Sequence, residues 1–162
     1  MPSDIVIRDA KEVDKNFSAR HSAKSKIYIY RIHMNQVSDP FTNRYTWHIR
    51  YPLNVDNMCE ALNILVGKHD FSSFRAAGGA PMSPVRTIFD AECKVQTEEL
   101  IIKIHANGFL YHMVRNIVGS LVAVGRGRYS VDHFKNIFES RDRNKEASTA
   151  PPQGLCLYKV FY

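Results

Sequence analysis

Hydrophobic residues recur every three or four positions in the stretch NGFLYHMVRNIVGS and beyond it, which predicts an amphipathic helix over residues 109–124. His112 and Arg115 fall on the opposite side of this helix, and Gly119 follows one turn later, so another group could approach the cation closely. From the pattern alone, Arg115 either extends its guanidinium to water or pairs with a carboxylate elsewhere in the fold. The side expected to be buried carries Leu110, Met113, Val114, Ile117, Val118, Leu121 and Val124.

Apolar and polar residues alternate over residues 85–96 and again over residues 99–107. This pattern predicts two antiparallel strands joined by a turn of about three residues, with one face of the hairpin buried. The residues expected on that face are Val85, Thr87, Phe89, Ala91, Cys93 and Val95 in the first strand, and Leu100, Ile102, Ile104 and Ala106 in the second.

Short runs of β-branched and aromatic residues predict further strands. They lie at residues 4–13, 26–34, 44–50 and 154–162.

Two more helices are predicted from their capping residues. Asn54 begins one of about three turns that Gly67 ends, and Ser130 begins the other, over residues 131–140. The segments between the predicted elements are rich in Gly, Ala and Pro or in charge, and we expect mobile loops there. These loops are residues 75–84 and 141–153.

The order of these elements predicts an α+β fold in a single domain over residues 1–162, with an antiparallel sheet and helices packed on one face. The arrangement is similar to a split βαβ unit. Folds of that kind leave the other sheet face free, and RNA-recognition domains often use such a face.

Composition and charge add a modest preference for a polyanionic partner. The chain has 162 residues and a formal net charge of +6. No apolar run approaches the ~20 residues of a membrane-spanning helix and the start lacks a signal-peptide core, so we expect a cytoplasmic protein without a membrane partner. Cys59, Cys93 and Cys156 are far apart and are expected to be reduced core residues. The histidines show no metal-ligand spacing, so no metal is expected.

Five stretches carry a family resemblance. They are FSARHSAKSKIYIYRI (17–32), HDFSSFRAAGG (69–79), SPVRTI (83–88), NGFLYHMVRNIVGSL (107–121) and APPQGLCLYKVFY (150–162). Taken together and in order, they resemble the C-terminal domain of the TruA family of tRNA pseudouridine synthases, which act on the anticodon stem-loop.

One feature of that family is missing. Its signature is a G-R-T-D-A-G segment in an N-terminal domain, whose aspartate is the catalytic nucleophile, and none of the aspartates in this chain lies in such a context. The resemblance therefore implies a C-terminal half, either an expressed fragment or a short natural product, which is inactive on its own.

The resemblance implies an isomerase that converts uridine to pseudouridine in tRNA, without a cofactor and as a homodimer when full-length. Because the target base must leave the stack, the protein needs cations for the phosphates and a flat group for the flipped uracil. A non-catalytic RNA-binding module and a dimerisation module are the alternatives, and the same sheet and basic residues would suit either.

Tyr28 and Arg115 are the catalytic residues that the resemblance implies. Tyr28 matches the tyrosine that stacks on the target base, whereas Tyr30, two residues on, is the better candidate for simple packing. Arg115 matches an arginine that can pair with the nucleophilic aspartate and keep it ionised. We expect the side chains of Tyr28 and Arg115 to converge on one partly open cleft.

A wider set is expected to bind the substrate. Basic residues before Tyr28 and around the Gly-rich loop form a candidate rim for the RNA backbone, although each could equally be an ordinary solvated surface residue. The substrate-binding residues predicted in this way are Tyr28, Arg20, Lys26, Arg75, Arg86, Asn107 and His112.

Overall fold

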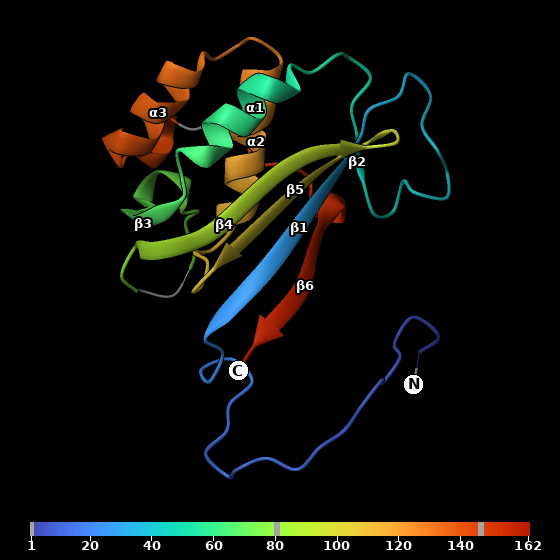
Figure 1. Ribbon diagram of the computed structural model, residues 1–162, viewed down its shortest axis with the longest axis vertical. Helices are drawn as coiled ribbons and strands as arrows, with labels where there is room; N and C mark the ends of the chain where they lie inside the picture. Colours follow the sequence, from blue (N-terminus) through green and yellow to red (C-terminus); the bar gives the residue numbers. More distant parts are fainter. Residues whose placement is uncertain (1, 80–81, 146–147) are drawn as a thin grey trace.

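The computed structural model describes residues 2–79, 82–145 and 148–162, and within them it forms one six-stranded sheet with three α-helices on one side (Figure 1). The predicted α+β class is therefore confirmed. The strands are β1 (Ser25–His33), β2 (Trp47–His48), β3 (Gly67–Asp70), β4 (Val85–Gln96), β5 (Glu99–Ala106) and β6 (Leu155–Phe161). The helices are α1 (Val55–Asn63), α2 (Met113–Gly125) and α3 (Val131–Ser140), with short 3-10 turns η1 (Ser72–Phe74), η2 (Arg143–Lys145) and η3 (Pro152–Gly154).

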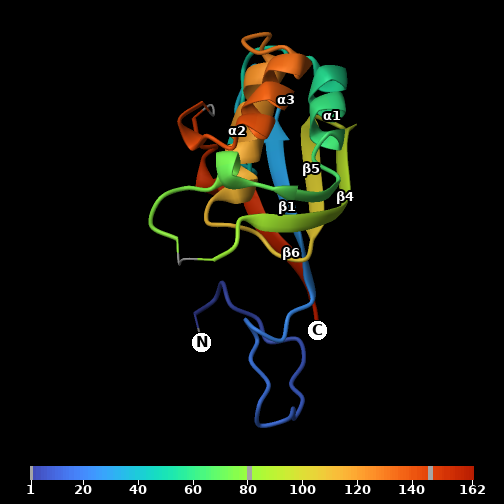
Figure 2. The same cartoon turned by 90° about the vertical axis from the view of Figure 1, so that its left-hand side faces the viewer.

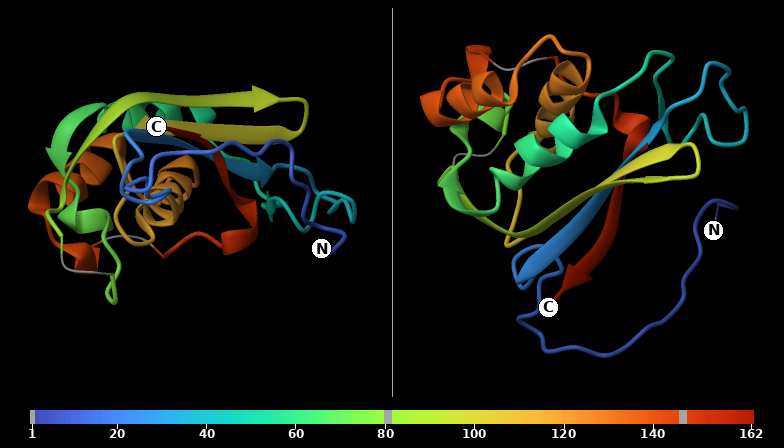
Figure 3. Two further views of the ribbon diagram at one scale, coloured as in Figure 1. Left: turned by 90° about the horizontal axis from the view of Figure 1, so that it is seen from below. Right: turned by 45° about the horizontal axis from the view of Figure 1, so that its top comes forward.

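The sheet runs in the order β2-β1-β5-β4-β3, and β6 pairs with β1 along the edge that β2 also occupies. All pairs are antiparallel except β1 with β2. Because β6 returns along β1, the C-terminus lies beside the start of β1, where Lys24 donates a backbone hydrogen bond to Phe161 (Figure 3). The end of β6 therefore lies beside the beginning of β1.

The β4–β5 hairpin contains an irregularity that the alternation did not predict. Ile88 pairs with Ala106, but the next pair joins Asp90 to His105, so Phe89 is the extra residue of a bulge. Ile88 is consequently buried, while Phe89 is exposed. The prediction of one buried face from Val85 to Val95 was therefore wrong: Val85, Thr87 and Phe89 do not share a face with Ala91, Cys93 and Val95.

Local capping signals were accurate for two helices. The Asn54 side chain accepts a hydrogen bond from the Asn57 amide at the start of α1, and the Ser130 side chain does the same for the His133 amide at the start of α3. However, α1 ends at Asn63, and Gly67 instead opens β3 with a φ of 116°. A left-handed backbone of this kind suits glycine.

Helix α2 begins later than its hydrophobic pattern predicts. His112 has a φ of 56°, in the left-handed region, and Met113 is the first helical residue. Residues 109–112 therefore form a loop, although Leu110 is still buried. Leu110, Met113, Ile117 and Leu121, the four residues expected to pack, are all at most 4% exposed.

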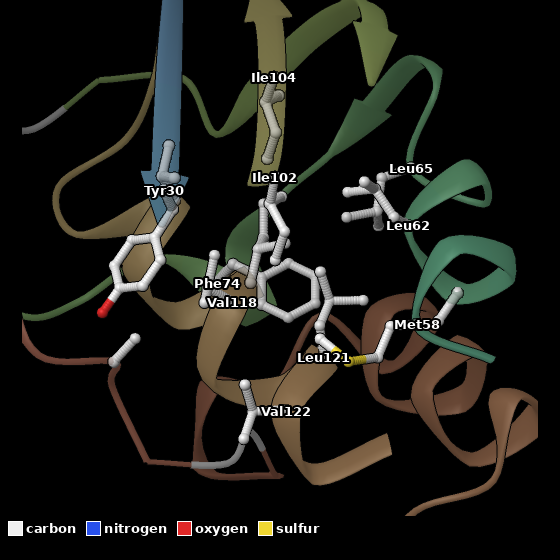
Figure 4. Close-up of a cluster of buried hydrophobic side chains, with 14 of the residues drawn as sticks. Tyr30, Met58, Leu62, Leu65, Phe74, Ile102, Ile104, Val118, Leu121 and Val122 are labelled. Carbon is white, nitrogen blue, oxygen red and sulfur yellow. The ribbon is translucent and has the colours of Figure 1, made fainter. Parts of the chain in front are cut away.

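The core fills the space between the sheet and the helices. Figure 4 shows Ile102 and Ile104 of β5 facing Leu62 of α1 and Leu65, which follows the helix, with Val118 and Leu121 of α2 completing the layer. Tyr30 of β1 lies at the side of this cluster with its hydroxyl turned away from it.

Two predicted strands were wrong or too long. Residues 4–13 form no strand: they belong to an extended, exposed N-terminal segment that runs away from the rest of the fold (Figure 2). The predicted strand at residues 44–50 is limited to Trp47 and His48, and it is parallel to β1. Strand-forming composition was present in both segments, but the first has no neighbouring strand and the second pairs with β1 over two residues only.

The remaining expectations concern loops and cysteines. The predicted mobile loops 75–84 and 141–153 include residues 80–81 and 146–147, which lie outside the described residues; the rest of the second loop holds η2 and most of η3. Cys59 and Cys93 are partly buried, but Cys156 is exposed on β6, so its assignment to the core was wrong.

Neither a membrane-spanning helix nor a metal site is found in the part of the chain that the structure describes. None of its helices is long and apolar enough to cross a bilayer. No group of three or more His, Cys, Asp or Glu side chains there is arranged to hold a metal ion.

Candidate functional site

The main candidate site is a cavity of about 450 Å³ at the end of the sheet where β1 and β4 begin and β5 ends. We call it the basic pocket. Four cationic side chains line it, and no acidic residue in the described part of the chain does. Its lining residues are Arg20, His21, Ala23, Lys26, Arg75, Gly79, Met82, Arg86, Asn107, Gly108, Phe109, Leu110 and Tyr111.

Strand geometry places the side chains of this pocket. Side chains two residues apart share a sheet face, so Lys26 and Tyr28 lie on the same side as the buried Tyr30, which is the side of the helices. The basic pocket is therefore on the helix side of the sheet, and the expectation that RNA would use the helix-free face gains no support from it.

Asn107 closes the sheet beside the pocket. Its amide donates to the Thr87 carbonyl at 3.0 Å, and its side-chain oxygen accepts from the Thr87 amide at 2.9 Å, so it continues the ladder between β4 and β5. The side-chain nitrogen of Asn107 has no partner in the described residues. It remains available as a donor in the pocket.

Arg86 is held in the pocket wall by neutral acceptors. Its Nη1 donates to the Ser83 carbonyl at 2.8 Å and to the Val85 carbonyl at 2.6 Å. Among the described residues, no carboxylate lies within 4.0 Å of it. Burial lowers the pKa of Arg86, and the nearby charge of Arg75 lowers it further. The two like charges act on one region, and a phosphate bound there would relieve their repulsion.

Tyr28 is a half-buried aromatic next to the pocket. Its ring meets the ring of Phe109 edge to face, with centroids 5.0 Å apart and an angle of 86°. Burial raises the pKa of Tyr28, so its hydroxyl stays protonated at neutral pH. On β6 its partner is Leu157, which is itself about half exposed. The Tyr28 ring thus lies at the boundary between core and solvent.

Tyr30 has a different environment, although it shares a strand and a face with Tyr28. It is fully buried, and its hydroxyl donates to the Pro151 carbonyl at 2.7 Å. Burial raises its pKa, and the charge of Arg115 opposes that shift. The prediction that Tyr30 serves in packing is confirmed.

Arg115 lies in the first turn of α2, is half-buried, and is held by neutral partners. Its Nε donates to the Ala150 carbonyl at 2.7 Å, and its Nη1 is 3.4 Å from Nε2 of His112. No carboxylate of the described residues is within 4.0 Å of it. The guanidinium is therefore fixed by a neutral carbonyl, with terminal nitrogens left for another acceptor.

Tyr111 and His112 form a stacked pair beside the pocket. Their ring centroids are 4.1 Å apart, with 25° between the planes. The Tyr111 carbonyl accepts from the Ala76 amide at 3.0 Å, and a Cβ at Gly79 would lie 2.8 Å from the Tyr111 Cβ. The glycine lets the loop lie directly on the tyrosine.

Five of the seven predicted substrate-binding residues line the basic pocket: Arg20, Lys26, Arg75, Arg86 and Asn107. The other two each contact an aromatic residue that does, since Tyr28 packs on Phe109 and His112 on Tyr111. Arg115 does not line it either, but it lies on the same side of the sheet as Tyr28. Their convergence on one cleft therefore stays a prediction.

Phe109 and Tyr111 line the pocket, although neither was predicted as a site residue. Both were assigned to the predicted helix, where an aromatic side chain has no particular role. The signal that was available is the sequence NGFLYH, in which a glycine and two aromatic residues precede the helix. A loop there would expose them at the pocket.

Comparison with known proteins matches the whole chain to one family. A family model described as tRNA pseudouridine synthase matches residues 61–162. A protein named tRNA pseudouridine synthase A from Thermoanaerobacter sp. (strain X514) is 46% identical over 162 residues, covering 100% of this chain and 66% of the relative. Relatives of the same name from Geobacillus sp. (strain WCH70) and Lacticaseibacillus casei (strain BL23) are each 44% identical, and 65% and 66% of their lengths are covered. The chain thus spans slightly less than two thirds of the length of these relatives.

Proposed function

The chain belongs to the tRNA pseudouridine synthase family, and we propose that it forms the part of such an enzyme that holds the RNA and orients the catalytic carboxylate. The substrate is tRNA, and the reaction is the isomerisation of uridine to pseudouridine. The observation that carries this proposal is the basic pocket, where four cations lie beside the exposed ring of Tyr111 and the partly buried ring of Phe109, with no acidic side chain among its described lining residues. Such a combination suits a nucleotide lifted out of its stack.

The chemistry defines what these residues have to do. The bond between N1 of uracil and C1′ of ribose breaks, the base turns over, and C5 bonds to C1′; the proton lost from C5 is balanced by one gained at N1. No electrons are exchanged with a second molecule. The protein therefore has to extrude the nucleotide, hold the free base and manage one proton.

Each proposed catalytic residue fits one of these tasks. Tyr28, a neutral phenol at the edge of the core, offers a ring on which the base can stack and a hydroxyl near its edge. Arg115 offers terminal guanidinium nitrogens to a carboxylate, whose pKa a fixed cation would lower. Arg20, Lys26, Arg75 and Arg86 bind the phosphates, with Asn107 and His112 at the margins of the site.

We propose that the nucleophile comes from outside the 162 residues. Among the residues that the structure describes, no acidic side chain lines the basic pocket and no carboxylate is within 4.0 Å of Arg115. The G-R-T-D-A-G segment of the resemblance is absent from the sequence. An aspartate of such a segment would meet Arg115 and complete the site.

The anticodon stem-loop as target, a homodimeric full-length enzyme and a cytoplasmic location are further parts of the proposal. They rest on the family resemblance. We also propose that the chain acts as a single C-terminal domain.

An assay of product separates this function from a non-catalytic RNA-binding module. The purified chain is incubated with unmodified tRNA, alone and with a separately expressed segment carrying G-R-T-D-A-G, and pseudouridine is detected by carbodiimide labelling. We expect binding but no product from the chain alone, because a missing nucleophile is not replaced by its neighbours, and product from the combination. Product from the chain alone at the combined rate contradicts the assignment of the nucleophile.

A further inference from the structure

Arg115 is held by a short segment that lies across α2, residues 148–151, which we call the strap. Two hydrogen bonds join them: the Ala150 amide donates to the Arg115 carbonyl at 3.0 Å, and the side-chain Nε of Arg115 donates to the Ala150 carbonyl at 2.7 Å. Ala150 is fully buried. The strap therefore fixes both the main chain and the guanidinium of the same residue.

Gly119 makes this approach possible. A Cβ at this position in α2 would overlap the Ser148 carbonyl oxygen and come within 3.2 Å of the Ala150 amide nitrogen. The close approach that the sequence pattern allowed at Gly119 is thus made by the chain itself. Any side chain there would move the strap away from Arg115.

Side chains hold the strap at two further points. The Thr149 hydroxyl donates to the side-chain oxygen of Asn116 at 2.7 Å, and the Tyr30 hydroxyl donates to the Pro151 carbonyl at 2.7 Å. Ala150 lies between these two anchors. Hydrogen bonds on either side therefore fix the position of the Ala150 carbonyl. The carbonyl in turn fixes Nε of Arg115.

Asn116 connects the strap to the basic pocket. It is fully buried, and its side-chain nitrogen donates to the Phe74 carbonyl at 3.0 Å while its oxygen accepts from Thr149. Phe74 is directly followed by Arg75, which lines the pocket. The buried Asn116 side chain thus links the segment of Phe74 and Arg75 to the strap, whose Ala150 carbonyl accepts the hydrogen bond from Arg115.

We infer that Asn116 and Thr149 are positioning residues, which act through the strap to fix the Arg115 guanidinium for the incoming carboxylate. The inference rests on the proposed function. Because Nε is hydrogen-bonded to Ala150, the guanidinium keeps one orientation. Its terminal nitrogens are therefore already oriented to bind a carboxylate. A loosened strap would let the guanidinium turn, and the cost would fall on the chemical step.

The test compares Thr149→Val with Thr149→Ser. Valine keeps the shape of threonine but leaves the buried Asn116 oxygen without its donor, whereas serine keeps the hydroxyl. Thr46→Val is the matched control, because Thr46 is buried and its hydroxyl donates to the Thr42 carbonyl instead of to a residue that holds the strap. The first measurement is the solvent-exchange rate of the Arg115 Nε–H in the 162-residue chain, by ¹⁵N NMR.

We expect Thr149→Val to speed this exchange by at least about tenfold, and Thr149→Ser and Thr46→Val to change it by less than about twofold. The second measurement is pseudouridine formation after addition of the G-R-T-D-A-G segment. There kcat should fall about tenfold in Thr149→Val with KM nearly unchanged, and serine should restore it.

Unchanged Nε–H exchange in Thr149→Val, or equal effects of valine and serine, overturns the inference. Faster exchange with an unchanged kcat overturns it as well, because the strap would then be structural only. If the unsubstituted chain and segment together make no pseudouridine, the proposed function fails; the exchange rates, which need no RNA, then decide on the strap alone.

Discussion

The two ends of β1 show how one strand can serve both a core and a site. At one end Tyr30 is fully buried beneath the helices and its hydroxyl is bonded to Pro151. At the other end Lys26 and Tyr28 are on the same face but only partly buried, beside the basic pocket. Two residues of sequence separate a sealed tyrosine from an accessible one.

The cause of this difference lies in α2 rather than in β1. The hydrophobic pattern would carry the helix back to residue 109, but His112 adopts a left-handed backbone and the helix begins at Met113. Phe109 and Tyr111 therefore remain in a loop that walls the pocket. A left-handed backbone at a non-glycine residue costs free energy and is found more often at functional sites. Because α2 begins later than the hydrophobic pattern predicts, it does not cover this end of the sheet.

The largest expected effect is on the sealed side. Ile102→Ala removes a fully buried side chain from the centre of the core and should lower the free energy of unfolding by about 2–5 kcal/mol. Lys26→Met, at the open end of β1, should change it by less than about 0.5 kcal/mol. Urea denaturation followed by circular dichroism measures both, and similar losses in the two variants would refute the division of the sheet into a core and a site.

A smaller effect should separate the two tyrosines. Tyr30→Phe leaves the Pro151 carbonyl without its donor and should cost about 1–2 kcal/mol of stability. The Tyr28 hydroxyl has no hydrogen-bond partner in the described residues, so Tyr28→Phe should cost less than about 0.5 kcal/mol. The same denaturation experiment applies. A larger loss of unfolding free energy from Tyr28→Phe than from Tyr30→Phe would show that the pocket end of β1 contributes more to stability than the buried end.

The pH dependence of stability should sharpen the same contrast. Burial raises the pKa of Tyr28 and of Tyr30 above the ordinary value of about 10. The unfolded chain therefore loses these protons first, and the stability they contribute is complete below about pH 10 and declines as the pH rises further. Tyr30→Phe should flatten this decline more than Tyr28→Phe does. Unfolding free energies measured on both sides of pH 10 provide the test, and equal flattening by the two variants contradicts it.

The sequence predicted elements whose signals are local. Helix α3 was predicted with its bounds and its Ser130 cap, and the alternation in β5 was correct, because capping and periodicity act within a few residues. The bulge at Phe89 and the absence of a strand at residues 4–13 depend on which backbone lies alongside, and no single segment encodes that.

The candidate site divides in the same way. Its cations could be named from the sequence because they cluster before Tyr28 and around the Gly-rich loop, and because the family resemblance favoured Arg20 and Arg86. Five of the predicted substrate residues do line one pocket. The aromatic residues of the pocket could not be predicted from the sequence, because the position where α2 begins decides whether Phe109 and Tyr111 lie in a helix or in a loop. The acceptor of Arg115 was equally hidden, since Ala150 is 35 residues away in sequence.

The most direct test of the open end as an RNA site is the affinity for an anticodon stem-loop as a function of salt, measured for Arg86→Met and Arg50→Met. Arg50 is exposed and follows β2, at the opposite end of β1 from the pocket. Removing one phosphate contact should lower affinity severalfold and reduce the slope of log affinity against log salt by about 1. We expect this for Arg86→Met and no change for Arg50→Met. Equal effects of the two substitutions would contradict the assignment of RNA binding to the basic pocket.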